Sequence, residues 1–236
     1  MRIDKFLANT KIGSRKEVKT FLKKGRVSVN GEIIKKDKTQ IDPLKDIIAF
    51  DGEVIHYSQF EYYMLYKPEG YISATKDDSH PVVCELIPSI HELFPVGRLD
   101  IDTTGLLIMT NDGELGHLLT APKKHIPKVY EVLADGIVNE EDQEVFKKGI
   151  PLKDFTTQSS DLRIIEVKEN KTKCHVTIHE GKFHQVKRMF GYIEKPVLSL
   201  KRIQMGDVKL DSSLKKGEYR PLTTDEINSL YGKTML

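Results

Sequence analysis

Apolar positions near the start of the chain predict two short helices. Residues Ile3–Leu7 and Val18–Leu22 each place large apolar side chains at i, i+3 and i+4, which is the spacing of one helical face. Ser14 and Glu17 form a capping-box pattern ahead of the second helix. Gly25 is placed to end that helix in a left-handed conformation.

A β-hairpin is predicted directly after these helices. Val27 and Val29 alternate with polar neighbours, Asn30-Gly31 is a two-residue turn signal, and Ile33-Ile34 begins the returning strand. We expect this helix, helix, hairpin unit to form a small domain over residues 1–58, with a second domain over residues 59–236.

The rest of the chain favours strands over helices. Without a regular alternation of strands and helices, this pattern predicts an α+β domain with a mainly antiparallel, mixed sheet. Strands are expected over residues 62–66, 106–109, 129–133, 162–167 and 174–178, and helices over residues 140–148, 185–190 and 224–230.

Charge is distributed unevenly along the 236 residues. Residues 1–58 hold 13 Lys and Arg against 8 Asp and Glu, whereas the remainder holds 24 against 27. A basic first domain on a near-neutral body is typical of proteins that bind polyanions. Long cations outside the apolar stripe would contact phosphates, which gives affinity rather than sequence reading. These cations are Arg15, Lys16, Lys19, Lys23, Lys24 and Arg26.

Several classes of protein are disfavoured by what the sequence lacks. No stretch is apolar enough to cross a membrane, and the start of the chain has no signal-peptide core, so we expect a cytoplasmic protein. Cys84 and Cys174 form no metal-binding or disulfide pattern. No dinucleotide fingerprint, phosphate loop or metal-ligand set is present, so no cofactor and no metal are expected. No dimerisation signal is evident, and a monomer is expected.

One stretch places charged residues beside a buried strand. In Gly97-Arg98-Leu99-Asp100, a short loop precedes the apolar run 106–109, and such a loop can hold a carboxylate at the wall of a cleft. From spacing alone, we favour a turn with a surface ion pair between Arg98 and Asp100. Asp102 and Asp112 could join Asp100 in the metal cluster of a nuclease, but we favour loop hydrogen bonding and Asx-turn roles for them.

Four segments together resemble a known family. Gly97–Asn111 runs Gly-Arg-Leu-Asp, two residues, Thr, one residue, Gly, four apolar residues, Thr, Asn, and is similar to the signature of pseudouridine synthases acting on ribosomal RNA, in the RsuA family. Leu65–Gly70, Lys128–Val132 and Glu180–Phe190 resemble further motifs of that family, in the same order. The resemblance also implies a strand over residues 197–206, after the last of these motifs. Residues 1–31 resemble the αL RNA-binding module of a ribosomal small-subunit protein.

The resemblance implies a central RNA-binding cleft and a role for each site residue. Asp100 would be the catalytic carboxylate, as nucleophile or as activator of the ribose, and Lys187 would be the cation paired with it, with Arg188 in reserve. Such a cation offsets the cost of burying an ionised carboxylate. Tyr130 would stack on the uracil and help to remove its C5 proton. Arg98 would fill the space that the flipped base leaves, or clamp a phosphate.

The segment His184–Phe190 is closest to the small-subunit form of its motif. It therefore favours 16S ribosomal RNA, or a small-subunit assembly intermediate, as the partner. Three other functions stay open: a synthase for large-subunit RNA, a non-catalytic assembly factor, and a metal-dependent nuclease. His117, His125 and His184 are expected to make RNA or packing contacts rather than to act as catalysts.

Overall fold

The computed structural model describes residues 1–55, 57–89, 91–121 and 124–232. These residues divide into two compact units, Met1–Glu61 with Pro88–Glu92, and Tyr62–Ile87 with Leu93–Leu236. The first unit therefore reaches slightly beyond the boundary expected at residue 58. It also includes Pro88–Glu92, which lies within the range expected for the second domain.

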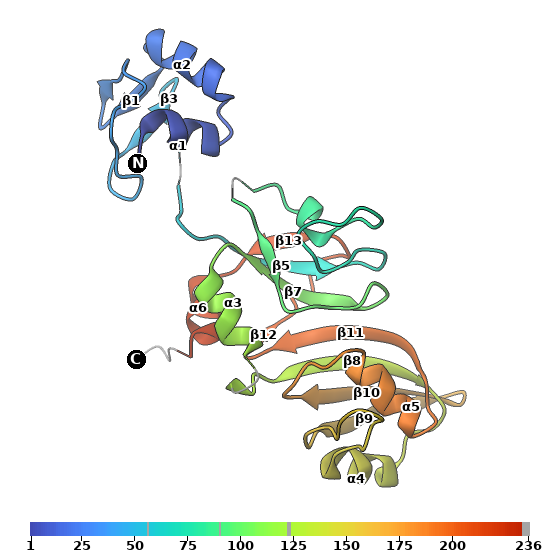
Figure 1. Ribbon diagram of the computed structural model, residues 1–236. Helices are drawn as coiled ribbons and strands as arrows, with labels where there is room; N and C mark the ends of the chain where they lie inside the picture. The colour runs from blue at the N-terminus through green and yellow to red at the C-terminus, as the bar shows by residue number, and fades with distance from the viewer. Residues whose placement is uncertain (56, 90, 122–123, 233–236) are drawn as a thin grey trace. The chain divides into compact units, whose positions relative to one another are not determined.

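The first unit has the helix, helix, hairpin order that its apolar pattern predicts (Figure 1). Helices α1 (Ile3–Asn9) and α2 (Arg15–Lys23) precede a sheet with strand order β2-β1-β3-β4. The strands are β1 (Val27–Val29), β2 (Glu32–Ile33), β3 (Ile48–Phe50) and β4 (Glu53–Val54). The apolar stripes of both helices meet in one core of Ile3, Phe6, Leu7, Val18, Leu22, Val27, Ile41 and Ile48.

Local signals in this unit have the predicted geometry. Ser14 and Glu17 each bond the other's backbone N–H in a capping box at the start of α2. Gly25 follows the helix with a φ of +71°. Asn30 and Gly31 have φ values of 52° and 84°, as a tight turn with two left-handed residues requires.

Side-chain contacts explain why Pro88–Glu92 belongs to the first unit. The His91 ring packs edge-on against Tyr57 with 5.7 Å between ring centroids, and its Nε2 lies 2.9 Å from the carbonyl oxygen of Ser58. The hydroxyl of Ser89 donates to the carboxylate of Glu61. These tertiary contacts have no periodic signature in the sequence.

The second unit is built on one mixed sheet with the order β13-β5-β7-β11-β8-β10-β9. Strands β7 and β11 run parallel, and the other neighbours in this order are antiparallel, which confirms the predicted α+β fold. Strand β6 also pairs with β7, and β12 with β11. The bounds are β5 (Tyr62–Lys67), β6 (Phe94–Val96), β7 (Thr104–Thr110), β8 (Lys128–Asp135), β9 (Asp161–Lys168), β10 (Lys171–Ile178), β11 (Val197–Met205), β12 (Val208–Lys209) and β13 (Tyr219–Pro221).

Both faces of β7 are buried, which explains its wholly apolar run. Leu106 and Ile108 join a core with side chains of α3 (Gly113–Thr120) and α6 (Thr224–Leu230). Leu107 and Met109 join a second core with side chains of α4 (Glu140–Lys148) and α5 (Gln185–Tyr192). A short 3-10 helix, Val83–Leu86, contributes to the second core. The sequence predicted the bounds of α4 and α6 correctly, but it assigned no helix to α3.

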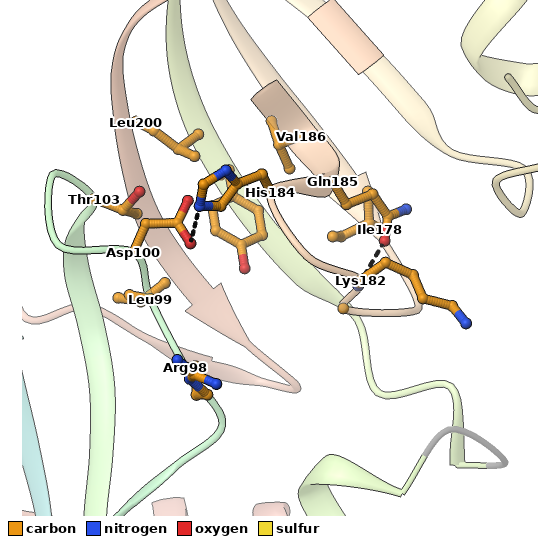
Figure 2. Close-up of a pocket in the computed structure, with 12 residues that line it drawn as sticks. Arg98, Leu99, Asp100, Thr103, Ile178, Lys182, His184, Gln185, Val186 and Leu200 are labelled. Carbon is orange, nitrogen blue, oxygen red and sulfur yellow. Dashed lines mark hydrogen bonds and ion pairs between the residues drawn. The ribbon is translucent and has the colours of Figure 1, made fainter. Parts of the chain in front are cut away.

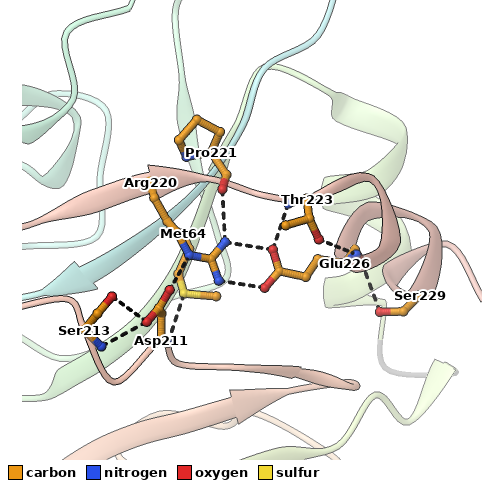
Figure 3. A network of polar contacts seen from close by, with 8 residues as sticks. All are labelled: Met64, Asp211, Ser213, Arg220, Pro221, Thr223, Glu226 and Ser229. Carbon is orange, nitrogen blue, oxygen red and sulfur yellow. Dashed lines mark hydrogen bonds and ion pairs between the residues drawn. The ribbon is translucent and has the colours of Figure 1, made fainter.

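Arg220 in β13 ties the last described strand to α6 (Figure 3). Its guanidinium donates to Asp211 at 2.6 Å and to Glu226 at 2.8 Å. Hydrogen bonds from Ser213 and Arg220 lower the pKa of Asp211 to about 2. Thr223 and Glu226 form the capping box that begins α6. Strand β13 and helix α6 are thus held together by charged hydrogen bonds as well as by apolar packing.

Neither cysteine takes part in a disulfide: Cys84 is half-buried and Cys174 is buried. Among the residues that the structure describes, no helix combines the length and apolar character needed to span a bilayer.

Candidate active site

The loop that carries Asp100 emerges where the sheet splits. Strand β5 pairs with Gly105–Thr110 along one edge of β7, so β11 and β6 share the other edge. Strand β11 pairs with Thr104 and Gly105 at the start of β7, whereas β6 pairs with Ile108–Thr110 at its end. The connection over residues 97–103 joins β6 to β7 and therefore lies next to β11.

Lys67, for which the sequence predicted no role, holds this loop from the protein interior. Its side chain is fully buried at the end of β5. The ammonium group donates to the backbone carbonyls of Pro68 and Asp100 at 3.0 Å, and of Thr103 at 2.9 Å. Burial lowers the pKa of Lys67 to about 8, although the nearby carboxylates of Asp102 and Asp100 oppose the shift.

Two further contacts fix the same loop. The hydroxyl of Ser73 bonds both the N–H and the carbonyl oxygen of Leu99, each at 3.0 Å. The N–H of Gly70 donates to the carbonyl oxygen of Ile101 at 2.8 Å. The backbone on both sides of Asp100 is therefore held by the segment that follows β5.

The carboxylate of Asp100 lies beside the basic side chains of Lys187 and His184. Figure 2 shows its contact with His184. Lys187 Nζ is 3.0 Å from Asp100 Oδ2 and 2.6 Å from Asp102 Oδ1. His184 Nε2 is 3.6 Å from Asp100 Oδ1. Burial alone would lower the pKa of Lys187, but its bonds to Asp102 and Asp100 outweigh burial and raise it. The Lys187 cation is thus kept charged beside Asp100.

The start of α5 delivers Lys187 to this position. His184 precedes the helix in a left-handed conformation with a φ of 49°, and Lys187 follows in the first turn. Arg188 points elsewhere: its guanidinium pairs with Asp154 and lies 5.2 Å from the centre of the Phe155 ring. In the structure Lys187 pairs with Asp100, whereas Arg188 pairs with Asp154.

Tyr130 lies on the sheet beside this ion pair. It is in register with Arg202 of β11, which is in register with Gly105 of β7, so the three residues form one row across the sheet. Tyr130 is 7 % exposed and Arg202 is 2 % exposed. Lys128, two residues before Tyr130, faces the same side, and burial lowers its pKa to about 8.

These residues line a cleft with a volume of about 830 Å³. Binding sites for small organic groups commonly enclose about 300–1,000 Å³. Asp100 and Tyr130 also line a narrower hollow that Figure 2 shows with Leu200 and Ile178. The cleft is rich in cations and aromatic rings, and its lining includes Arg98, Asp100, Asp102, Lys128, Tyr130, Lys182, Phe183, His184, Lys187 and Arg202.

Asp102 and Asp112 have different surroundings. The expected loop role of Asp102 is wrong in one respect, because its carboxylate accepts from Lys187 across the cleft. Asp112 does cap a helix: it accepts from the first N–H groups of α3 and from the hydroxyls of Tyr62 and Tyr231. The carboxylate of Asp112 therefore serves as the N-cap of α3. No group of three or more potential metal ligands is found among the described residues.

The basic residues of the first unit divide into two groups. Arg26 is held in place, because its Nε donates to Asp51 at 2.8 Å and its guanidinium packs over the rings of Phe21 and Phe50. Lys19 lies 3.6 Å from Asp37. The other cations on and beside α2 are exposed, namely Arg15, Lys16, Lys23 and Lys24.

Two family models match the chain. The model described as RNA pseudouridylate synthase matches residues 61–192, and the S4 domain model matches residues 1–48. With the fold and site described above, these matches show that the chain belongs to the RNA pseudouridine synthase family and carries an S4 domain.

Full-length relatives support this assignment. The chain is 42 % identical over 234 residues to an uncharacterized RNA pseudouridine synthase, YtzG, of Bacillus subtilis, covering 98 % of each chain. It is 40 % identical over 236 residues to ribosomal small subunit pseudouridine synthase A of Escherichia coli, covering 98 % of this chain and all of that one. A crystal structure of a pseudouridylate synthase matches with a TM-score of 0.68 and 36 % identity, over 98 % of this chain and 99 % of the other.

Proposed function

We propose that this chain converts a uridine of 16S ribosomal RNA to pseudouridine during maturation of the small subunit. The observation that carries the proposal is the ion pair of Asp100 with Lys187, at 3.0 Å, in a cleft that Tyr130 also lines. The relatives named for the ribosomal small subunit support 16S RNA as the target. Either naked RNA or an assembly intermediate is compatible with the exposed cations of the S4 domain.

The reaction breaks the bond between N1 of uracil and C1′ of the ribose, and forms a bond between C5 and C1′. The C5 proton is removed and N1 ends with a proton, so no atom is gained or lost, and we propose no cofactor. Asp100 acts on the ribose, and Lys187 forms an ion pair with its carboxylate. Tyr130 stacks on the uracil and assists removal of the C5 proton.

The target base must leave its stack to reach Asp100. Arg98 is exposed and lines the cleft, so we propose that it occupies the space that the base vacates. Arg15, Lys16, Lys23 and Lys24 bind phosphates elsewhere on the RNA. We further propose that the protein acts in the cytoplasm as a monomer, which sedimentation in solution can test.

Substitution of the catalytic carboxylate tests the mechanism. Asp100→Ala and the nearly isosteric Asp100→Asn should slow pseudouridine formation on 16S RNA by about 10⁴-fold or more. Both variants should bind the RNA with nearly unchanged affinity, because Asp100 lies at the ribose and not at the phosphates. Single-turnover assays and filter binding measure the two effects. Substantial pseudouridine formation by Asp100→Asn would contradict the assignment.

Pseudouridine mapping of ribosomal RNA from cells that lack this protein tests the target. We expect one site to be missing from 16S RNA and restored by the wild-type gene but not by Asp100→Ala. A missing site in large-subunit RNA would move the substrate to that subunit. A complete set of sites would support a non-catalytic role in assembly.

A further inference from the structure

An exposed aromatic ring lies at the mouth of the cleft. Phe183 is 76 % exposed, more than any other large apolar side chain in the part of the chain that the structure describes. Single exposed apolar residues are common on protein surfaces, so exposure alone says little. Phe183, however, lines the cleft that contains Asp100.

The ring of Phe183 is stacked on the ring of His184. Their centroids are 3.8 Å apart and their planes differ by 18°. Nε2 of His184 in turn lies 3.6 Å from Oδ1 of Asp100. The two rings therefore form a stack that begins beside the catalytic carboxylate and ends in solvent, and it is called the Phe183–His184 platform below.

The backbone beneath the platform is strained. His184 has a φ of 49°, a left-handed conformation that costs a non-glycine residue free energy. Strain of this kind persists where the surroundings enforce it, and it often occurs at ligand-binding positions. Here the left-handed residue lies between the exposed ring of Phe183 and the helix that carries Lys187.

The surroundings of the platform are basic. Arg98, Lys128 and Lys182 line the same cleft. Cations that follow a phosphate backbone, combined with aromatic rings that stack on bases, are typical of sites for single-stranded nucleic acid. Asp100 and Tyr130 lie deeper in the cleft and would contact the target nucleotide, which leaves the exposed ring for a neighbouring nucleotide.

We propose that the Phe183–His184 platform stacks against the base of an RNA nucleotide adjacent to the target uridine. The proposal rests on the proposed action of this cleft on RNA. A base held on Phe183 would keep the strand unstacked next to the target, with the phosphates near Lys182 and Arg98. Phe183 is thus a binding and positioning residue, not a catalytic one.

The absence of tryptophan from the sequence allows a direct test. Phe183→Trp introduces a single fluorescent reporter at the platform, and a base that stacks on indole quenches its emission. Tyr192→Trp is the matched control, because Tyr192 is an exposed aromatic residue at the end of α5 and is not part of the cleft lining. The probes are a short oligouridylate and a ribose-phosphate chain of the same length without bases.

We expect oligouridylate to quench the Phe183→Trp emission in a saturable way and the chain without bases to leave it unchanged. The Tyr192→Trp emission should respond to neither probe. Phe183→Ala should weaken oligouridylate binding by about tenfold, and Phe183→Tyr should restore it. Equal quenching by both probes, or no quenching at all, would contradict the proposal that the platform stacks against a base.

The fluorescence experiment needs no turnover, so it separates the platform from the proposed reaction. If the Phe183→Trp emission is not quenched but the wild type forms pseudouridine, the stacking proposal is wrong and the proposed reaction stands. Quenching together with an active Asp100→Asn variant would reject the catalytic assignment and retain the platform.

Discussion

The buried ammonium group of Lys67 binds the backbone of the catalytic loop. It donates to the carbonyl oxygens of Asp100 and Thr103, and it holds the loop against β5 together with the bonds from Ser73 and Gly70. A buried carbonyl without a donor costs free energy, so the loop is stable in this position as long as Lys67 is present. Lys67 thereby sets where the Asp100 carboxylate lies.

Substitution of Lys67 should separate positioning from chemistry. Lys67→Met keeps an apolar stem but leaves several buried carbonyls without donors, so we expect a loss of stability of about 2 kcal/mol or more. The single-turnover rate should fall by at least about tenfold, with RNA affinity little changed, because Lys67 does not line the cleft. Lys195→Met is the control, since Lys195 is also largely buried but bonds the carboxylate of Asp142 and lies outside the cleft lining.

The pH dependence of unfolding checks the charge state of Lys67. Its pKa is about 8 in the folded protein, against 10.5 for an ordinary lysine. Between these values the unfolded chain binds more protons than the folded one, so the destabilising effect is complete below pH 8 and is lost as the pH rises towards 10.5. The stability of the wild type relative to Lys67→Met should therefore increase over this window in denaturant titrations. A flat difference would show that Lys67 is not desolvated.

The parallel contact of β7 with β11 joins the two halves of the catalytic sheet, and it depends on Gly105. A Cβ atom at Gly105 would lie 2.2 Å from the carbonyl oxygen of Arg202, and the residue has a φ of +109°. The close approach also brings Arg202 and Tyr130 into the row next to the catalytic loop. A side chain at this position would therefore disturb both the sheet and the site.

Gly105→Ala should destabilise the protein by about 3 kcal/mol or more, because the clash is with backbone and the conformation is left-handed. Gly113→Ala is the matched control: this glycine begins α3 with nothing within 4 Å of the added atom. We expect the control to be neutral or slightly stabilising. Urea unfolding compares the two. Similar stabilities for both variants would contradict the close packing at Gly105.

Elements with a regular apolar period were predictable from the sequence, whereas those shaped by packing were not. Helix α3 was missed because Gly113 and Gly116 are poor helix formers. The structure explains Gly116, since the ring of Phe94 lies 2.8 Å from where a Cβ atom would be. Strand β6 was missed because Pro95 interrupts it. The sequence alone does not show which side chain will pack against a given glycine, or which strand will pair with a segment that contains proline.

Contacts in the candidate site that depend on tertiary packing were likewise not predictable from the sequence. The family resemblance pointed to Asp100, Tyr130 and Lys187, and the structure brings the first and last of these into contact. The role of Lys67 could not be predicted, because the carbonyls that it bonds are brought to it by the tertiary fold. The sharing of Lys187 with Asp102 likewise depends on the position of α5, which no local pattern determines.

At the scale of the whole molecule, positive charge is concentrated in the S4 domain. Exposed cations release counterions when they bind phosphates, so the affinity for RNA should fall steeply with salt. Replacing Arg15, Lys16, Lys23 and Lys24 with Gln should weaken RNA binding and reduce the slope of log K against log salt by up to about 3.

The control is charge removal from the second unit. Lys147, Lys148, Lys168 and Lys171 are exposed and lie outside the cleft lining, so their replacement with Gln should leave the slope nearly unchanged. Binding titrations over a range of salt concentrations measure both. Equal slopes for the two variants would show that the S4 cations do not anchor the RNA.

The pairing of β13 with β5 has a consequence for how the protein is made. Strand β5 ends at Lys67, yet its partner on one side, Tyr219–Pro221, is synthesised about 150 residues later (Figure 1). Translation delivers the S4 strands together, because they are close in sequence, but it leaves the edge of β5 unpaired until residue 221 has left the ribosome. The nascent chain thus carries an open strand edge through most of its synthesis.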